Sequence, residues 1–150
     1  FKYGGTLDKF LGDGLMATFG TPSTGPSDSL NAIKCARAMM VSADHWNVER
    51  RDLAEPEIKV SIGLHFGEVV LGDIGVNRLE FAVIGNTVNV ASRLEALTRK
   101  LGVSLVASDD IVAQAQSQTV DGSRELAGFK QQAPQEIRGV SEPLGVWTLS

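Results

Sequence analysis

The first third of the chain alternates apolar and polar positions and then changes to a helical period. Residues 7–11 and 15–19 predict two short strands. The Gly-Asp-Gly sequence at 12–14 is a strong hairpin turn signal, because glycine tolerates positive φ at little cost. Apolar residues then recur at helical period from the N-cap residue Ser27 to about residue 53. This helix carries a stripe of large apolar side chains that we expect in the core: Met39, Met40 and Trp46.

The middle of the chain predicts three more strands. Residues 58–64 alternate apolar and polar side chains, and we expect a turn near Gly67 to pair them as a hairpin with residues 68–72. Residues 79–84 predict the next strand, which leads directly into a second helix.

The last third predicts a strand at 103–107, a short helix over 109–115 capped by Ser108, and a closing β region over 124–149. Strands paired by hairpins with helices between them predict an α+β fold with a mainly antiparallel sheet. A chain of 150 residues is long enough for a single domain with its own core.

The second helix is the most informative segment. Gly85 and a capping Asn86 precede its first turn, and Gly102 ends it after two cationic residues. Asn89 and Arg93 are four residues apart and therefore share one face. Arginine presents a planar fork of donors to phosphate oxygens, so the pair is suited to a nucleotide, although such pairs also form ordinary solvated faces. The apolar positions of this helix are expected to pack inward: Val88, Ala91, Leu94 and Leu97.

Composition and charge narrow the functional classes. The chain is 43% hydrophobic and 21% charged, as in ordinary soluble globular proteins. Its net charge of −4 argues against a nucleic-acid binder or a membrane-surface binder, since both need a basic surface. The single cysteine, Cys35, excludes an internal disulfide and is expected to be buried. Because no apolar run reaches the length of a membrane span, we expect a cytoplasmic protein, or the cytoplasmic part of a longer one.

Four blocks of the sequence resemble the class III adenylate/guanylate cyclase catalytic domain. They are GTLDKFLGD at 5–13, IGLHFGE at 62–68, VIGNTVNVASRLE at 83–95 and IRGV at 137–140, in the order of the family. The resemblance implies a ferredoxin-like βαββαβ core. The family begins with a strand that carries an aspartate and with two helices, and nothing in this chain matches them. We therefore expect residues 1–150 to be a single cyclase domain without these elements, and the fragment alone to be inactive.

The resemblance also implies a reaction. Family members close ATP into 3′,5′-cyclic AMP and release pyrophosphate, with two Mg²⁺ or Mn²⁺ ions assisting attack of the ribose 3′-hydroxyl on the α-phosphate. Asp13, at the tip of the predicted hairpin, resembles the second of two metal-binding aspartates, although aspartate is also an ordinary turn residue. Arg93 resembles the arginine that stabilises the transition state, and Asn89 resembles the asparagine that orients the ribose.

Three further positions concern the base and the terminal phosphates. Lys9 matches a base-reading lysine, and its ammonium can only donate, which suits N1 of adenine better than N1–H of guanine. Ala82 stands where the family has an aspartate or threonine that accepts from the adenine amino group, so we expect weaker selection of ATP over GTP. Arg138 aligns loosely with a lysine that contacts the terminal phosphates, but a strand arginine is more often a surface residue.

The family's active sites form between two catalytic domains, one presenting the aspartates and the other the lysine, asparagine and arginine. We therefore expect a homodimer that acts in cyclic-nucleotide signalling, with an upstream regulatory or sensor domain in the full protein. No nucleic-acid or membrane contact is expected from this segment. The alternative is a catalytically silent cyclase homology domain that binds nucleotide or dimerises as a regulatory module. A guanylate cyclase is disfavoured by Lys9.

Overall fold

The computed structural model describes residues 2–73, 81–119 and 124–150. Its elements follow the chain in this order: β1 (Thr6–Leu11), β2 (Gly14–Thr18), α1 (Asp28–Asp52), β3 (Ile62–Leu64), β4 (Val70–Asp73), β5 (Phe81–Ile84), α2 (Asn86–Leu101), β6 (Leu105–Ser108), α3 (Asp109–Ser117), β7 (Lys130–Gln135) and β8 (Leu144–Leu149). No helix in this part of the chain is long and apolar enough to cross a membrane.

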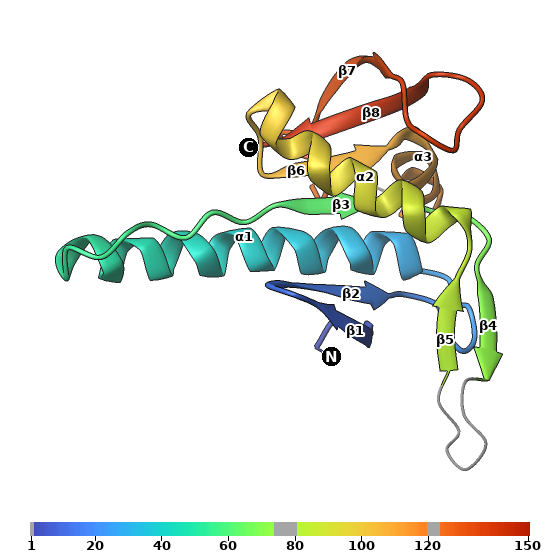
Figure 1. Cartoon of the computed structure of the whole chain (residues 1–150), viewed down its shortest axis with the longest axis horizontal. Coiled ribbons are helices and arrows are strands. Elements are labelled where there is room, and N and C mark those ends of the chain that lie inside the picture. Colours follow the sequence, from blue (N-terminus) through green and yellow to red (C-terminus); the bar gives the residue numbers. More distant parts are fainter. Residues whose placement is uncertain (1, 74–80, 120–123) are drawn as a thin grey trace.

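The main sheet has four strands in the order β3-β6-β8-β7 (Figure 1). Strand β3 runs parallel to β6, whereas β8 is antiparallel to both of its neighbours. Two antiparallel ribbons, β1–β2 and β4–β5, complete the described strands, and β4–β5 projects away from the main sheet (Figure 1). Antiparallel pairs therefore predominate, which confirms the predicted α+β class.

The core lies between the main sheet and its helices. One cluster joins α2 to the sheet through Val90, Leu94, Val106, Ile137 and Val146. A second cluster joins α1 and α3 to β6 through Ala32, Ala36, Leu105, Ala107, Ile111 and Val112. Leu94 is fully buried, as its inward position on the predicted helix indicated.

Gly63 lets β3 and α2 come unusually close together. A Cβ atom at this position would overlap the carbonyl oxygen of Ala91 and the amide nitrogen of Glu95. These two backbone atoms face each other across one turn of α2, so the strand backbone lies directly on the helix backbone. The contact fixes the height of α2 above the sheet.

Several local predictions are confirmed. The β1–β2 hairpin turns at Gly12 and Asp13, and Gly102 ends α2 in the left-handed conformation with φ 67°. Ser108 caps α3, because its hydroxyl accepts from the amide of Ile111. The predicted cap of α2 is wrong, since Gly85 occupies the N-cap position and Asn86 is already helical.

The predicted hairpin between residues 58–64 and 68–72 is also wrong. Only Ile62–Leu64 forms a strand, and it pairs with β6, while β4 pairs with β5. Asn47 of α1 accounts for the loss of the first residue of the predicted strand. Its side-chain amide donates to the carbonyl of Ile58 (2.8 Å) and accepts from the amide of Ile58 (2.6 Å), so the helix takes both backbone groups that a strand would use. The first two residues of the strand predicted at 79–84 lie outside the described residues.

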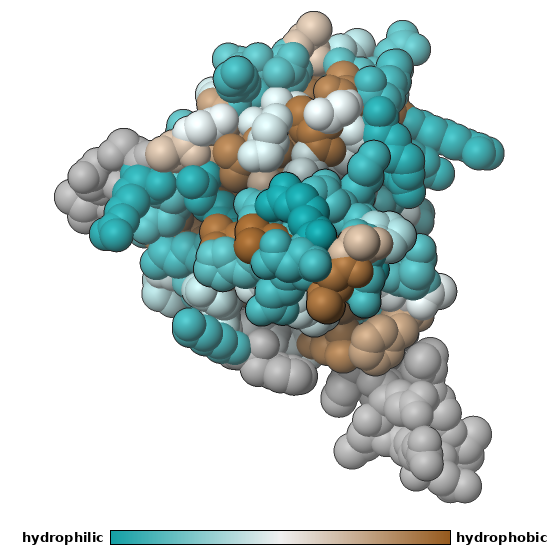
Figure 2. Space-filling model, turned by 90° about the vertical axis from the view of Figure 1, so that its left-hand side faces the viewer, coloured by the Kyte–Doolittle hydropathy of each residue, from teal (hydrophilic) through white to brown (hydrophobic). Residues whose placement is uncertain are grey.

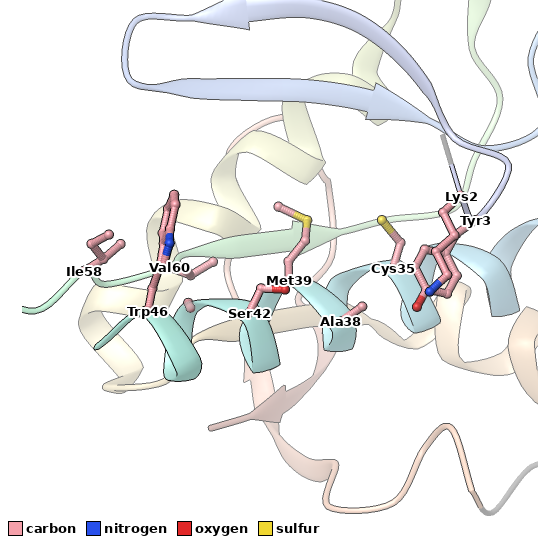
Figure 3. Close-up of a pocket in the computed structure, with 10 residues that line it drawn as sticks. Lys2, Tyr3, Cys35, Ala38, Met39, Ser42, Trp46, Ile58 and Val60 are labelled. Carbon is pink, nitrogen blue, oxygen red and sulfur yellow. The ribbon is translucent and has the colours of Figure 1, made fainter. Parts of the chain in front are cut away.

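The apolar stripe on α1 is only partly in the core. Met39 is 42% exposed and Trp46 is 61% exposed, because the C-terminal half of α1 extends past the main sheet (Figure 1). Figure 3 shows both side chains, with half-buried Cys35, along an open groove of about 460 Å³ that Ile58 also lines. Viewed from this end, Figure 2 shows apolar surface in several places among polar side chains. Of the stripe, Met40 packs against the core.

Candidate functional site

The first turn of α2 is tied to two loops by its own side chains. Gly85 has φ 137°, which turns the chain from β5 into the helix. The side-chain amide of Asn86 then donates to the carbonyl of Gly139 (3.0 Å), and the hydroxyl of Thr87 donates to the carbonyl of Glu68 (2.5 Å). These bonds hold the start of the helix against the segments that follow β3 and β7.

Asn89 and Arg93 project from the next turns of α2. Asn89 is exposed and Arg93 is half-buried. Gly139, with φ 92°, allows its loop to approach: a Cβ atom there would lie 2.9 Å from Oδ1 of Asn86 and 3.6 Å from Nη1 of Arg93. The structure therefore brings together the blocks at 83–95 and 137–140, which are far apart in the sequence.

This arrangement is chemically suited to an anion. Arg138 is exposed and directly precedes Gly139, beside which the Arg93 guanidinium lies. The segment that contains Arg138 thus lies beside the Arg93 guanidinium, in a chain whose net charge is −4. Guanidinium groups bind phosphate oxygens through paired donors, and the neighbouring amide of Asn89 can both donate and accept.

Two further sequence-predicted residues, Lys9 and Asp13, lie on the β1–β2 hairpin. Asp13 is exposed at its turn. Lys9 is on β1, its side chain 43% exposed, with its ammonium 3.5 Å from the carboxylate of Asp8. Figure 1 shows this hairpin and α2 on opposite sides of α1 in that view. Ala82 lies in β5, opposite Gly72 of β4, shortly before α2 begins.

The described residues offer a divalent metal ion few ligands. Magnesium prefers oxygen ligands, and the exposed carboxylate of Asp13 can supply one of them. Among the residues that the structure describes, no three His, Cys, Asp or Glu side chains are grouped so that they could hold a metal ion. Asp13 therefore stays a predicted metal ligand, and the described residues of one chain do not complete a metal site around it.

A cavity of about 400 Å³ opens between the end of β2, the start of α1 and the loop after β3. His65 lines it, and sequence reasoning assigned this residue no role. Its Nδ1 lies 2.7 Å from the hydroxyl of Ser108 and 4.0 Å from a carboxylate oxygen of Asp110. Burial lowers the pKa of His65 below 6.5, and the nearby charge of Asp110 opposes this only in part. The sequence around Ser108 predicted that this residue caps a helix, but it did not predict that its hydroxyl contacts His65.

The lowered pKa of His65 predicts a loss of stability in mild acid. Above pH 6.5 the histidine is neutral in both states. As the pH falls below 6.5, the unfolded chain takes up the proton before the folded chain does, so the free energy of unfolding decreases until the folded pKa is passed. Urea unfolding between pH 7.5 and 5 should show this decrease, and His65→Asn should reduce it. His45→Asn changes an exposed histidine and serves as the control. If the free energy of unfolding fell equally with pH in the wild type and in both variants, the prediction would be contradicted.

Comparisons with known proteins identify the family and the fold of the chain. The family model described as the adenylate and guanylate cyclase catalytic domain matches residues 8–139. Adenylate cyclase 1 of Rhizobium meliloti (strain 1021) is 31% identical over 144 residues, 95% of this chain and 20% of that protein. The adenylate cyclase of Anabaena cylindrica is 39% identical over 114 residues, 73% of this chain and 22% of that protein. The chain thus spans about a fifth of the length of these curated relatives.

Solved structures of cyclases have the same fold. The guanylyl cyclase Cya2 superposes with a TM-score of 0.76 at 29% identity, covering 98% of this chain and 70% of that one. The adenylyl cyclase CyaB from P. aeruginosa gives a TM-score of 0.74 at 27% identity, covering 99% of this chain and 73% of that one. With a family match over most of its length, this chain belongs to the adenylate and guanylate cyclase catalytic domain family.

Proposed function

We propose that this domain converts ATP into 3′,5′-cyclic AMP and pyrophosphate. The observation that carries the proposal is the polar flank of α2, where the first-turn bond from Asn86 to Gly139 holds Arg93 beside the segment that contains Arg138. Two curated relatives named as adenylate cyclases support the choice of ATP, as does the donor-only ammonium of Lys9.

In the proposed reaction, the ribose 3′-oxygen forms a bond to the α-phosphorus while the bond from this phosphorus to the bridging oxygen breaks. Pyrophosphate leaves with the electron pair, and the proton of the 3′-hydroxyl passes to solvent water. Such a transfer needs positioning and charge stabilisation more than covalent help from the protein. Arg93 stabilises the charge that develops at the α-phosphate, Asn89 orients the ribose, and Arg138 contacts the terminal phosphates.

We also propose that Mg²⁺ or Mn²⁺ takes part, with Asp13 as one ligand. When bound, such ions would neutralise phosphate charge and polarise the attacking oxygen. The described residues of one chain do not complete a site for them. The roles proposed for Arg93, Asn89 and Lys9 therefore rest on the chemistry of their side chains and do not depend on a bound metal ion.

We further propose that the active unit is a homodimer in which the hairpin of one copy meets α2 of the other. Figure 1 shows the β1–β2 hairpin, whose turn contains Asp13, and helix α2, which contains Arg93, on opposite sides of α1 in that view. A second copy could bring its hairpin tip to the exposed flank of α2. The hairpin also exposes apolar side chains that a partner could cover: Leu7 (38%), Phe10 (73%) and Leu15 (50%).

The proposal is tested with the full-length protein that contains this domain, incubated with Mn²⁺ and either ATP or GTP. We expect cyclic AMP as the main product, with some cyclic GMP because Ala82 cannot accept from the adenine amino group through its side chain. Chromatographic quantification of both products measures the preference. A preference for GTP would contradict the assignment of ATP, and no product at saturating metal would favour a silent regulatory module.

A further inference from the structure

Strand β1 contains an irregularity immediately before Lys9. Leu7 pairs with Ala17, but the next pair along the ribbon is Lys9 with Met16, so Asp8 has no partner of its own on β2. One extra residue in one strand of an antiparallel pair is a β-bulge. Bulges often lie beside active sites, where they change the direction of a side chain.

The bulge decides on which face of the ribbon Lys9 lies. Residues directly opposite each other share a face, and successive residues of a regular strand alternate between faces. Ala17 and Met16 are successive, so Leu7 and Lys9 lie on opposite faces. In a regular strand, two residues separated by one position would share a face. Asp8, as the extra residue, therefore puts Lys9 on the face of Met16 instead of the face of Leu7.

Asp8 also supplies charge to Lys9. Its Oδ2 lies 3.5 Å from the ammonium nitrogen of Lys9, and its side chain is only 5% exposed, against 43% for Lys9. That oxygen has no hydrogen-bond partner among the described residues. A buried carboxylate is costly unless it is paired, so the ammonium is the group that compensates this charge. Lysine has three donors, which leaves others available on the exposed side.

We propose that Asp8 is a positioning residue for Lys9 and sets the preference of this domain for ATP over GTP. The bulge determines the face of the ribbon on which Lys9 lies. The buried carboxylate of Asp8 restrains the Lys9 ammonium, so that the ammonium meets the base in one orientation. This inference rests on the proposed function, in which Lys9 reads the purine. Asp8 acts only through Lys9 and touches neither the substrate nor the reacting atoms.

The test is Asp8→Asn in the full-length protein, because asparagine keeps the shape and removes the charge. We expect the ratio of kcat/KM for ATP to that for GTP to fall about tenfold, mainly through a higher KM for ATP, as when one charged contact is lost. Asp8→Glu should restore part of the ratio. In a Lys9→Ala background, Asp8→Asn should change the ratio no further, because coupled residues are not additive.

A purely structural role would give a different result. Asp109→Asn is the matched control, since that carboxylate accepts from the indole of Trp147 (2.5 Å) and belongs to a different part of the fold from Lys9. If Asp8→Asn, like this control, lowered thermal stability and left the ATP-to-GTP ratio unchanged, the inference would be overturned. If the wild-type protein cyclised neither nucleotide, the proposed function would fail separately. Equilibrium binding of ATP and GTP to the wild-type protein and to Asp8→Asn would then test the role of Asp8. A changed ratio of the two dissociation constants would support this role, and an unchanged ratio or no binding would refute it.

Discussion

Replacing Arg93 by alanine is expected to lower kcat about 10²–10³-fold while the KM for ATP changes little. The charge on the α-phosphate is greatest in the transition state, and a fixed donor aimed at that charge contributes more there than in the bound substrate. Arg93 is half-buried, and its guanidinium lies beside Gly139. Initial rates of cyclic AMP formation over a range of ATP concentrations separate kcat from KM.

Arg99→Ala provides the matched control for this experiment. Arg99 is an exposed arginine of the same helix, and its guanidinium lies 3.4 Å from the carboxylate of Glu95 in an ordinary surface ion pair. Its removal should leave kcat within about twofold, because exposed pairs contribute little. If Arg93→Ala raised KM and left kcat unchanged, Arg93 would be an ordinary substrate-binding residue and its proposed role would be wrong.

Mixing two inactive variants tests whether the site is shared between subunits. Arg93→Ala and Asp13→Asn should each be nearly inactive, but in a mixed dimer one of the two sites receives an intact Arg93 and an intact Asp13. With random association, the mixture should recover about a quarter of wild-type activity, because half of the dimers are mixed and each has one working site. Absence of any recovery, with mixed dimers present by native mass spectrometry, would contradict a site between subunits.

Gly63→Ala is expected to lower the free energy of unfolding by about 3 kcal/mol, at the upper end of the range for overpacked sites. The new methyl group would overlap the carbonyl of Ala91 and the amide of Glu95. These are backbone atoms of α2, which cannot rotate away as a side chain does, so strand and helix must separate. Urea unfolding monitored by circular dichroism measures the loss.

Gly25→Ala is the control for this substitution. A Cβ atom at Gly25 would lie 3.2 Å from the tip of the Asp28 carboxylate, which can move, and the loop there is exposed. We expect a change of no more than about 0.5 kcal/mol, as for most surface positions. Equal losses in the two variants would mean that the contact between β3 and α2 is not the cause.

Elements with strong local signals were predictable from the sequence. The Gly-Asp turn indicated the first hairpin, and capping residues placed the start of α3 and the C-terminus of α2. The partner of β3 was not predictable in this way. An alternating pattern indicates a strand but not its neighbour, and the real neighbour, β6, is about forty residues away in the chain. The competition of Asn47 for the backbone of Ile58 likewise depends on tertiary contact.

The candidate site was predictable to the same extent. Helical spacing placed Asn89 and Arg93 on one face, because that geometry is local. The approach of Gly139 to Arg93 joins segments far apart in the sequence, and a local sequence pattern cannot predict such a contact. The bulge at Asp8 was also missed, since a strand pattern gives no register with its partner. The roles of these residues remain predictions for the experiments above.

The projecting β4–β5 ribbon has a consequence for motion near the helix that follows it. Two-stranded ribbons are only marginally stable on their own, so the cross-strand amides of this ribbon should exchange with deuterium at a lower opening free energy than those between β6 and β8. The bonds from Thr87 to Glu68 and from Asn86 to Gly139 lie between the ribbon and the rest of α2. These two hydrogen bonds hold the first turn of α2 to the neighbouring loops. The ribbon can therefore open and close locally without displacing α2.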